Sequence, residues 1–179
     1  FALLEAYRKA LQSNPVLASR LKEEARWGLE FVMKNRYSDG YRASSMGLLH
    51  WLDGVVGSKD DIKTVRIQNL PFDNFLYSGY EAYAALTLKE EYRKTYDRLV
   101  TIAEEDYSFA MEKYLKDGYA GFRQPYEHQY NTSQSQFMAT ASWASSQLYL
   151  LTGNQYYADK AVEFIEYVLE CQQTEPVGE

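Results

Sequence analysis

Apolar residues recur along this chain at intervals of three and four positions, the spacing that places them on one face of an α-helix. The same register occurs three times, with Ala25, Ala103 or Ala161 at its centre. A small side chain there lets a neighbouring helix approach closely. We predict three buried helical stripes that superpose through these alanines: Leu21, Ala25, Leu29, Val32 and Met33; Leu99, Ala103, Tyr107, Ala110 and Met111; and Tyr157, Ala161, Ile165, Val168 and Leu169.

The breaks between apolar runs divide the chain into three antiparallel helical hairpins. They predict helices over about 1–13 and 15–36, about 74–88 and 91–115, and about 133–151 and 155–172. The pairs Asp39-Gly40 and Asp117-Gly118 each follow a second helix and are typical of a turn that ends it. We therefore predict an all-α fold of repeated hairpins, forming a single domain over 1–179. Repetition of one hairpin is typical of a solenoid or a closed helical toroid.

Two long connections, about 37–72 and 116–131, join the hairpins. Each follows the second helix of one hairpin and precedes the first helix of the next, so both must leave the same end of the bundle. Connections of this length are often functional. We predict that this end is the working face, and that His50 or Trp51 lies near Tyr126 or His128 around an open groove.

Composition and charge narrow the classes of function. The net charge of −6 argues against a nucleic-acid partner, which requires clustered Lys and Arg. No apolar run is long enough for a membrane span, and no signal peptide is visible. The single cysteine, Cys171, excludes an internal disulfide. A metal pair between His50 and His128 is the less favoured interpretation, because such a site would also need carboxylates at ligand spacing. We predict neither a metal nor a cofactor.

Aromatic residues are abundant, with 17 Tyr, 8 Phe and 3 Trp. Some of them are expected to fill helix stripes, as we predict for Tyr7, Trp27, Tyr107 and Trp143. Others gather in the two connections beside His, Arg and carboxylate residues. Aromatic rings stack on the C–H faces of a sugar, while polar side chains bind its hydroxyls, so we predict an oligosaccharide or polysaccharide ligand. The alternative is that these rings only anchor the loops. The candidate substrate contacts are Tyr41, His50, Trp51, Arg123, Tyr126 and His128.

Three runs carry a resemblance to a known family: FALLEAYRKAL with LKEEARWGLEFVMKNRYSDGYRAS, then GYEAYAALTL, then ATASWASSQLYLLTGNQYYADKAVEFIEYVLECQ. Together they resemble the family-nine glycoside hydrolases, the endoglucanase or cellulase group. The resemblance implies an (α/α)6 toroid of six hairpins, of which this chain would supply about half, with the remaining hairpins of the parent domain as its partners. It also implies a secreted or periplasmic protein that degrades polysaccharide.

The catalytic motifs of that family do not occur in this sequence. The resemblance places an Asp-Ala-Gly-Asp motif shortly before the helix that matches Phe1 to Leu11, and a general-acid Glu in a later hairpin beyond Glu179. We therefore expect the catalytic carboxylates outside this chain, and no hydrolase activity from the chain alone. Glu127 is the only local catalytic candidate, and a weak one. The parent enzyme would hydrolyse a β-linked glucan or related glycan with inversion, using carboxyl groups about 6.5–9.5 Å apart.

Two alternatives remain open at this point. The chain could belong to another toroidal sugar enzyme, such as a glucuronyl hydrolase, lyase or epimerase, with Arg42, Arg66 or Arg123 binding a uronate carboxylate. It could also be a helical-repeat module that binds a protein. Among the substrate candidates Trp51 is the strongest, and we expect Trp51→Ala to weaken glycan binding by about 2 kcal/mol or more while leaving the fold intact.

Overall fold

The computed structural model describes residues 1–50, 53–55, 58–59, 62–89, 93–119 and 134–170. Within these ranges the fold is all-α, as predicted, with one small antiparallel sheet. The elements are α1 (Ala2–Ser13), α2 (Pro15–Lys34), β1 (Arg42–His50), β2 (Ile62–Gln68), α3 (Pro71–Leu88), α4 (Arg93–Asp117), α5 (Gln134–Thr152) and α6 (Gln155–Glu170). The six helices begin and end within a few residues of the predicted positions.

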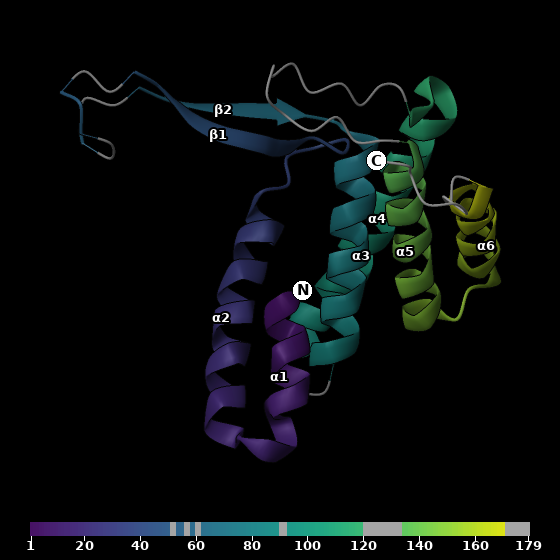
Figure 1. Cartoon of the computed structure of the whole chain (residues 1–179), viewed down its shortest axis with the longest axis horizontal. Helices are drawn as coiled ribbons and strands as arrows, with labels where there is room; N and C mark the ends of the chain where they lie inside the picture. The colour runs from purple at the N-terminus through teal and green to yellow at the C-terminus, as the bar shows by residue number, and fades with distance from the viewer. Residues whose placement is uncertain (51–52, 56–57, 60–61, 90–92, 120–133, 171–179) are drawn as a thin grey trace, which may run out of the picture.

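The helices form three hairpins, α1–α2, α3–α4 and α5–α6, as the apolar pattern predicts (Figure 1). The first helices of the hairpins, α1, α3 and α5, run in the same direction. Helix α3 packs extensively against both α4 and α5, whereas α1 touches α3 only lightly. Helices α2 and α4 end, and α3 and α5 begin, at the end of the bundle that carries the sheet (Figure 1). Both long connections therefore leave the same end.

Local sequence explains where the hairpins turn. The Asn14 side chain accepts a hydrogen bond of 3.0 Å from the backbone N–H of Leu17 and caps α2, whose first residue is Pro15. Gly118 follows α4 and Gly153 follows α5, with positive φ angles of 67° and 70°. The N–H of each glycine donates a hydrogen bond to a backbone carbonyl in the last turn of the preceding helix. These are the left-handed C-caps that glycine favours.

The connection 37–72 differs from our prediction, because it contains the β1–β2 hairpin rather than loop alone. The register pairs Arg42 with Gln68 and Met46 with Val65. Branched residues at alternate positions favour the strand, yet Val65 and Ile67 are 46% and 44% exposed. In the sequence Val65 and Ile67 do alternate with the polar residues Arg66 and Gln68, which is the pattern that indicates a strand, and our prediction of a loop overlooked it.

The core consists of two hydrophobic clusters that meet at α3. One joins α1 and α2 to the C-terminal half of α3 and the start of α4. The other joins α3 and α4 to α5 and α6 around Phe75, Tyr107 and Phe137. Helix α3 fits between its neighbours because small residues form much of its surface, among them Ser78, Gly79, Ala82 and Ala85.

The predicted stripes are buried on two of the three second helices. Ala25, Leu29 and Met33 are buried on α2, and all five stripe residues are buried on α4. On α6 the buried residues are Tyr157 and Phe164, so the prediction is wrong for Ile165 and Leu169, which are 39% and 60% exposed. The stripe there is rotated because only α5 packs extensively against α6.

The prediction that Trp27 fills a stripe is also wrong, since its side chain is 74% exposed. Tyr7 and Tyr107, in contrast, are buried as predicted.

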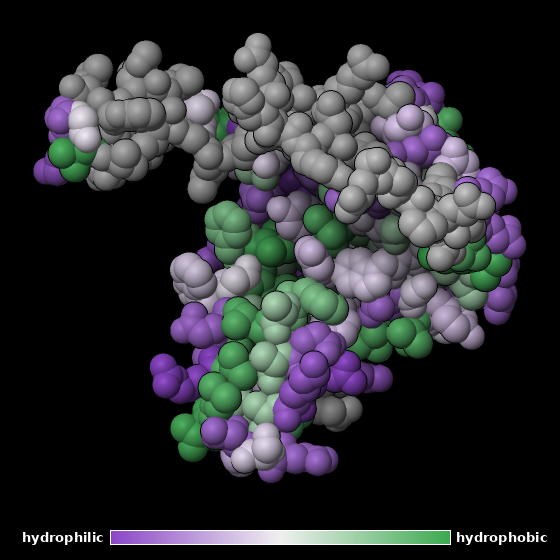
Figure 2. All heavy atoms as spheres, in the orientation of Figure 1, coloured by the Kyte–Doolittle hydropathy of each residue, from purple (hydrophilic) through white to green (hydrophobic). Residues whose placement is uncertain are grey.

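In the described ranges no helix combines the length and apolar character that a membrane crossing requires. In Figure 2 the centre of the visible face, over α3 and α5, carries pale residues of intermediate hydropathy, and strongly hydrophilic residues gather over the lower part of α1.

Candidate functional site

An open groove with three aromatic rings lies between α3, α5 and the start of α1. The Tyr80 and Trp143 rings meet edge to face with their centroids 5.2 Å apart. Phe1 packs against Trp143 at 5.8 Å, with the ring planes at 89°. The groove has a volume of about 330 Å³, and we call it the aromatic groove; its lining residues are Phe1, Leu76, Tyr80, Gln136, Ala139, Thr140 and Trp143.

Gly79 makes room for the Trp143 ring. A Cβ atom at position 79 would lie 2.2 Å from the Cζ3 atom of Trp143, far inside van der Waals contact. Glycine lowers helix stability by about 1 kcal/mol relative to alanine, so its place in the middle of α3 has a packing reason. The close approach of α3 to α5 therefore sets the position of the ring.

The sequence contains a signal for this groove that the expectation of a buried Trp143 overlooks. The buried face of α5 follows Phe137, Ala141, Ala144 and Leu148. Trp143 falls between the positions of that stripe, so it points to a different face of the helix. Our prediction that Trp143 only fills a stripe is therefore wrong, because the residue is partly exposed and lines the groove.

Polar groups border the rings of the aromatic groove. The Thr140 hydroxyl donates a hydrogen bond of 3.0 Å to the backbone carbonyl of Gln136, one turn earlier on α5. The hydroxyl oxygen can still accept a hydrogen bond from a ligand in the groove. Rings supply apolar contact area, and a few amide and hydroxyl groups fix orientation, which is the usual composition of a small-molecule site.

Asp73 lies in the first turn of α3, one helical turn before the groove residue Leu76. Burial raises the pKa of its carboxyl group from 3.8 to about 6, and the Arg42 charge opposes this rise. A carboxyl group with this pKa changes its charge close to neutral pH. Asp73 is not among the residues that line the groove, and the charge that acts on it is that of Arg42.

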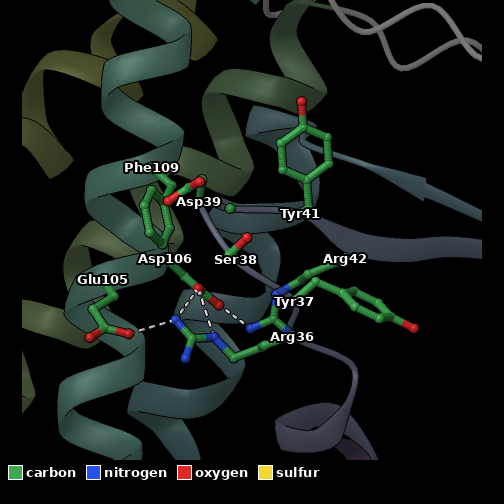
Figure 3. Close-up of a pocket in the computed structure, with 10 residues that line it drawn as sticks. Arg36, Tyr37, Ser38, Asp39, Tyr41, Arg42, Glu105, Asp106 and Phe109 are labelled. Atoms are coloured by element: carbon green, nitrogen blue, oxygen red, sulfur yellow. Dashed lines mark hydrogen bonds and ion pairs between the residues drawn. The ribbon is translucent and has the colours of Figure 1, made fainter.

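A buried ionic cluster occupies another side of α3, and we define it as Arg36, Arg42, Glu81 and Asp106. Arg42 donates a hydrogen bond of 2.6 Å to Glu81 and a second one to Asp106. Arg36 donates to the same Asp106 carboxylate at 2.8 Å and 3.0 Å (Figure 3). Arg42, Glu81 and Asp106 are at most 1% exposed. The cluster thus connects β1 and the end of α2 to α3 and α4.

Burial of Glu81, together with the nearby Asp106 carboxylate, raises the pKa of Glu81 well above its usual value, while Arg42 opposes the rise. Arg42 also stacks on the Tyr77 ring, with its guanidinium carbon 4.1 Å from the ring centroid. The buried guanidinium is thus held by Glu81, Asp106 and the Tyr77 ring, while its Nε atom has no hydrogen-bond partner. The suggestion that Arg42 binds a uronate carboxylate is therefore wrong: its charge is already paired inside the protein.

Tyr41, the substrate candidate whose side chain the structure describes, lies away from the aromatic groove. Its ring is 47% exposed and borders a cleft between the 37–41 turn and α4. We call this hollow the α4 cleft. It consists of two parts of about 160 and 340 Å³ that share Asp39, Tyr41 and Phe109. Figure 3 shows Asp39 beside the Phe109 ring, with Tyr41 on the same turn.

The remaining predicted site residues are not described. His50 ends β1, but its side chain lies outside the described part of the structure. Trp51, Arg123, Tyr126, Glu127 and His128 also lie outside the described residues. The predicted approach of His50 or Trp51 to Tyr126 or His128 therefore stays a prediction. The described residues hold no group of three or more His, Cys, Asp or Glu side chains arranged to bind a metal ion.

Comparison with known proteins assigns no family to the chain. No model of a protein family matches the sequence, and none of the curated proteins matches it at a significant level. The geometry of the groove and the arrangement of the hairpins are therefore the basis for proposing a function.

Proposed function

We propose that this chain is part of a carbohydrate-active enzyme and that the aromatic groove forms one wall of its glycan-binding cleft. The observation that carries the proposal is the cluster of Phe1, Tyr80 and Trp143 along an open groove on the first helices of the hairpins. Exposed, mutually packed rings present a rigid apolar surface that suits the C–H faces of pyranose rings. The neighbouring amide and hydroxyl groups suit their hydroxyls.

The position of the groove supports the same function. It extends from the middle of α3 and α5, where Tyr80 and Trp143 lie, through Leu76 and Gln136 toward the end of the bundle from which both long connections leave. A site at that end can combine a rigid helical wall with residues from the connections. The hairpin order and the resemblance to family-nine glycoside hydrolases favour an inverting hydrolase that acts on a β-linked glucan or related glycan.

In this proposal the chain binds and orients the glycan, and the two catalytic carboxylates come from motifs that this sequence lacks. In such an enzyme one carboxyl group protonates the leaving oxygen while the other activates water on the opposite face of the sugar. The described rings would hold the sugar chain in place during that reaction. Release of reducing sugar from a β-glucan by the purified chain would instead assign the chemistry to a local carboxylate, Asp73 or Glu127.

Tryptophan fluorescence tests the groove directly, because Trp143 borders it whereas Trp27 is exposed on α2. Because Trp51 is itself a candidate substrate contact, the comparison is made in a Trp51→Phe background. We expect cellotetraose to change the emission of Trp51→Phe and of Trp27→Phe/Trp51→Phe, and to leave that of Trp51→Phe/Trp143→Phe nearly unchanged. Calorimetry should show that Tyr80→Ala weakens binding about tenfold or more, since a desolvated aromatic contact carries about 1.4 kcal/mol or more. Circular dichroism checks that each variant is folded.

Two results would contradict the proposal. One is a fluorescence change that persists in Trp51→Phe/Trp143→Phe, and the other is wild-type affinity in a folded Tyr80→Ala variant. Preferential binding of an oligouronate over cellotetraose would favour the alternative of a sugar enzyme for acidic substrates.

A second candidate function, protein binding through a helical repeat, is favoured by one specific observation. The outer face of α2 exposes Val16, Trp27 and Phe31 by 74%, 74% and 55%. Exposed apolar patches of this kind mark interaction surfaces, and a further hairpin of a parent domain is the partner that the hairpin arrangement suggests. Light scattering should then show self-association of the chain that a Trp27→Glu/Phe31→Glu double variant abolishes.

A further inference from the structure

The α4 cleft is a second hollow, and it shares no lining residue with the aromatic groove. Its larger part, of about 340 Å³, is wide enough for a single sugar ring. Two aromatic side chains face it, the exposed ring of Tyr41 and the partly buried ring of Phe109. Its polar lining includes the Asn69 amide and the side chains of Asp39, Glu112 and Lys116.

The turn that carries Asp39 and Tyr41 is held rigidly. Within it, the Tyr41 N–H donates to the Ser38 carbonyl and the Tyr37 N–H to the Tyr41 carbonyl, both at 2.9 Å. From the start of α3, the amide groups of Asn69 and Asn74 donate to the carbonyls of Asp39 and Gly40 at 2.7 Å and 2.9 Å. The cleft is therefore formed before a ligand arrives, which lowers the entropy cost of binding.

Close packing also fixes the turn against α4. Gly40 has a φ angle of 77°, and a Cβ atom there would lie 2.8 Å from the Cβ of Phe109. Asp39 has a φ angle of 53°, a left-handed conformation that only glycine, asparagine and aspartate adopt with any frequency. An aspartate held in this way aims a carboxylate beside an aromatic ring, and the fold of the turn alone would be served equally well by asparagine.

The charges around the larger part of the cleft nearly balance. Asp39 and Glu112 supply two carboxylates, and Lys113 and Lys116 supply two ammonium groups. Lys113 is in addition paired with Asp117 at 2.6 Å. With Asp117 counted, three carboxylates face two ammonium groups, so the lining offers no excess of positive charge to a phosphate. The described residues also hold no group of carboxylates arranged to bind a metal ion. The lining offers ring surface, an amide and charged hydrogen-bonding groups of both signs, which together suit a neutral ligand with many hydroxyls.

We propose that the α4 cleft is a second saccharide-binding site, which takes a neutral pyranose unit against Tyr41 and Phe109. The Asp39 and Glu112 carboxylates accept hydrogen bonds from the sugar hydroxyls, and the Asn69 amide and Lys116 donate to them. The site lies apart from the aromatic groove and is independent of the function proposed for that groove. It would let the protein hold a polysaccharide at two points.

The test compares variants of the two sites in isothermal titration with cellotetraose, xylotetraose and maltotetraose, and in gels that contain mixed-linkage β-glucan. We expect Tyr41→Ala and Asp39→Asn each to weaken binding at one class of sites at least fivefold. Asn keeps the left-handed backbone, so Asp39→Asn should retain the wild-type melting temperature. Tyr149→Ala is the matched control, because Tyr149 is an exposed tyrosine of α5, 40% accessible, that borders neither site.

Unchanged saccharide binding in both folded variants would overturn the proposal, and so would a wild-type chain that binds none of these neutral saccharides. If Tyr41→Ala lowers the melting temperature, the saccharide affinity of Asp39→Asn alone decides whether the α4 cleft binds a sugar. The two proposals fail separately. Binding that depends on Tyr41 but not on Tyr80 leaves the α4 cleft and removes the groove, whereas binding that depends on Tyr80 but not on Tyr41 does the reverse.

Discussion

The aromatic groove and the buried ionic cluster lie on two sides of the same helix, α3, and they differ in almost every physical property. The groove is open and has three aromatic rings among its seven lining residues. The cluster holds four charged side chains in mutual hydrogen bonds, and it reaches the smaller part of the α4 cleft, where Arg36 is 19% exposed. From the sequence we considered Arg42 as a residue that could bind a substrate, and we predicted that Trp143 fills a helix stripe. In the structure the charged side chains of the cluster bind one another, whereas the Tyr80 and Trp143 rings line an open groove.

This difference predicts that the cluster controls stability and the groove controls binding. Arg42→Met leaves the Glu81 and Asp106 carboxylates buried without their shared partner, and we expect a loss of about 3–5 kcal/mol in the free energy of unfolding. Urea denaturation measures it. The surface pair Lys160–Glu163, at 2.6 Å, is the control, since Lys160→Ala should change stability by no more than about 1 kcal/mol. A small effect of Arg42→Met would show that the cluster does not hold the hairpins together.

The next effect concerns Asp73. Its pKa rises from 3.8 to about 6 on folding, so the folded protein holds this proton more tightly than the unfolded chain. The stability that the group contributes is complete below about pH 4 and is lost as the pH rises through 6. Asp73→Asn removes this dependence. We expect the variant to gain up to about 3 kcal/mol relative to wild type between pH 4 and pH 7.

Denaturation of both proteins at several pH values measures this difference, and the other titrating groups cancel because both proteins share them. A difference between Asp73→Asn and wild type that stays constant with pH would contradict the raised pKa.

Two glycines provide a matched pair with effects of opposite sign. Gly79→Ala forces the Trp143 ring to move, and overpacking of this kind costs about 1–3 kcal/mol. Gly28 lies inside α2, where an added Cβ atom would meet open space within 4 Å, so Gly28→Ala should stabilise the protein by about 0.5–1 kcal/mol. Melting curves measure both effects, and only Gly79→Ala should also weaken cellotetraose binding. Equal effects of the two variants on the melting temperature would argue against close packing of the Trp143 ring on Gly79.

The smallest effect is expected at Trp27. Its side chain is 74% exposed, so Trp27→Ala should change the free energy of unfolding by no more than about 0.5 kcal/mol, as is usual for surface positions. Trp143→Ala should cost clearly more, since it removes the contacts with Phe1 and Tyr80. If Trp27→Ala proves as destabilising as Trp143→Ala, the exposed face of α2 is covered in solution, which would favour the protein-binding alternative.

Helical periodicity predicted the hairpins because it is a local property, present within each run of residues. The turn residues Asn14, Gly118 and Gly153 set the boundaries for the same reason. Arg42 is paired with Glu81 over 39 positions and with Asp106 over 64 positions. No local sequence pattern indicates such distant pairs. A residue in a connection therefore looked free to bind a substrate although tertiary structure had already paired its charge.

The groove was predictable in part. Trp143 lies off the buried stripe of α5, and that offset is visible in the sequence once the stripe is assigned. Its neighbour across the groove, Tyr80, comes from another hairpin, and only the packing of α3 against α5 brings the two rings together. The sequence thus indicates which face of its helix each ring occupies, but it does not indicate that the two rings come into contact.

Helix α3 belongs to both hydrophobic clusters, and this has a consequence for local opening of the protein. The amide protons in its middle can exchange with solvent only when both clusters separate, so their protection should approach that of global unfolding. Helix α6 belongs to one cluster only, through Tyr157 and Phe164, and exposes Ile165 and Leu169, so we expect its amide protons to be less protected than those of α3. We therefore expect α6 to open before α3, the helix that carries the Tyr80 ring of the groove.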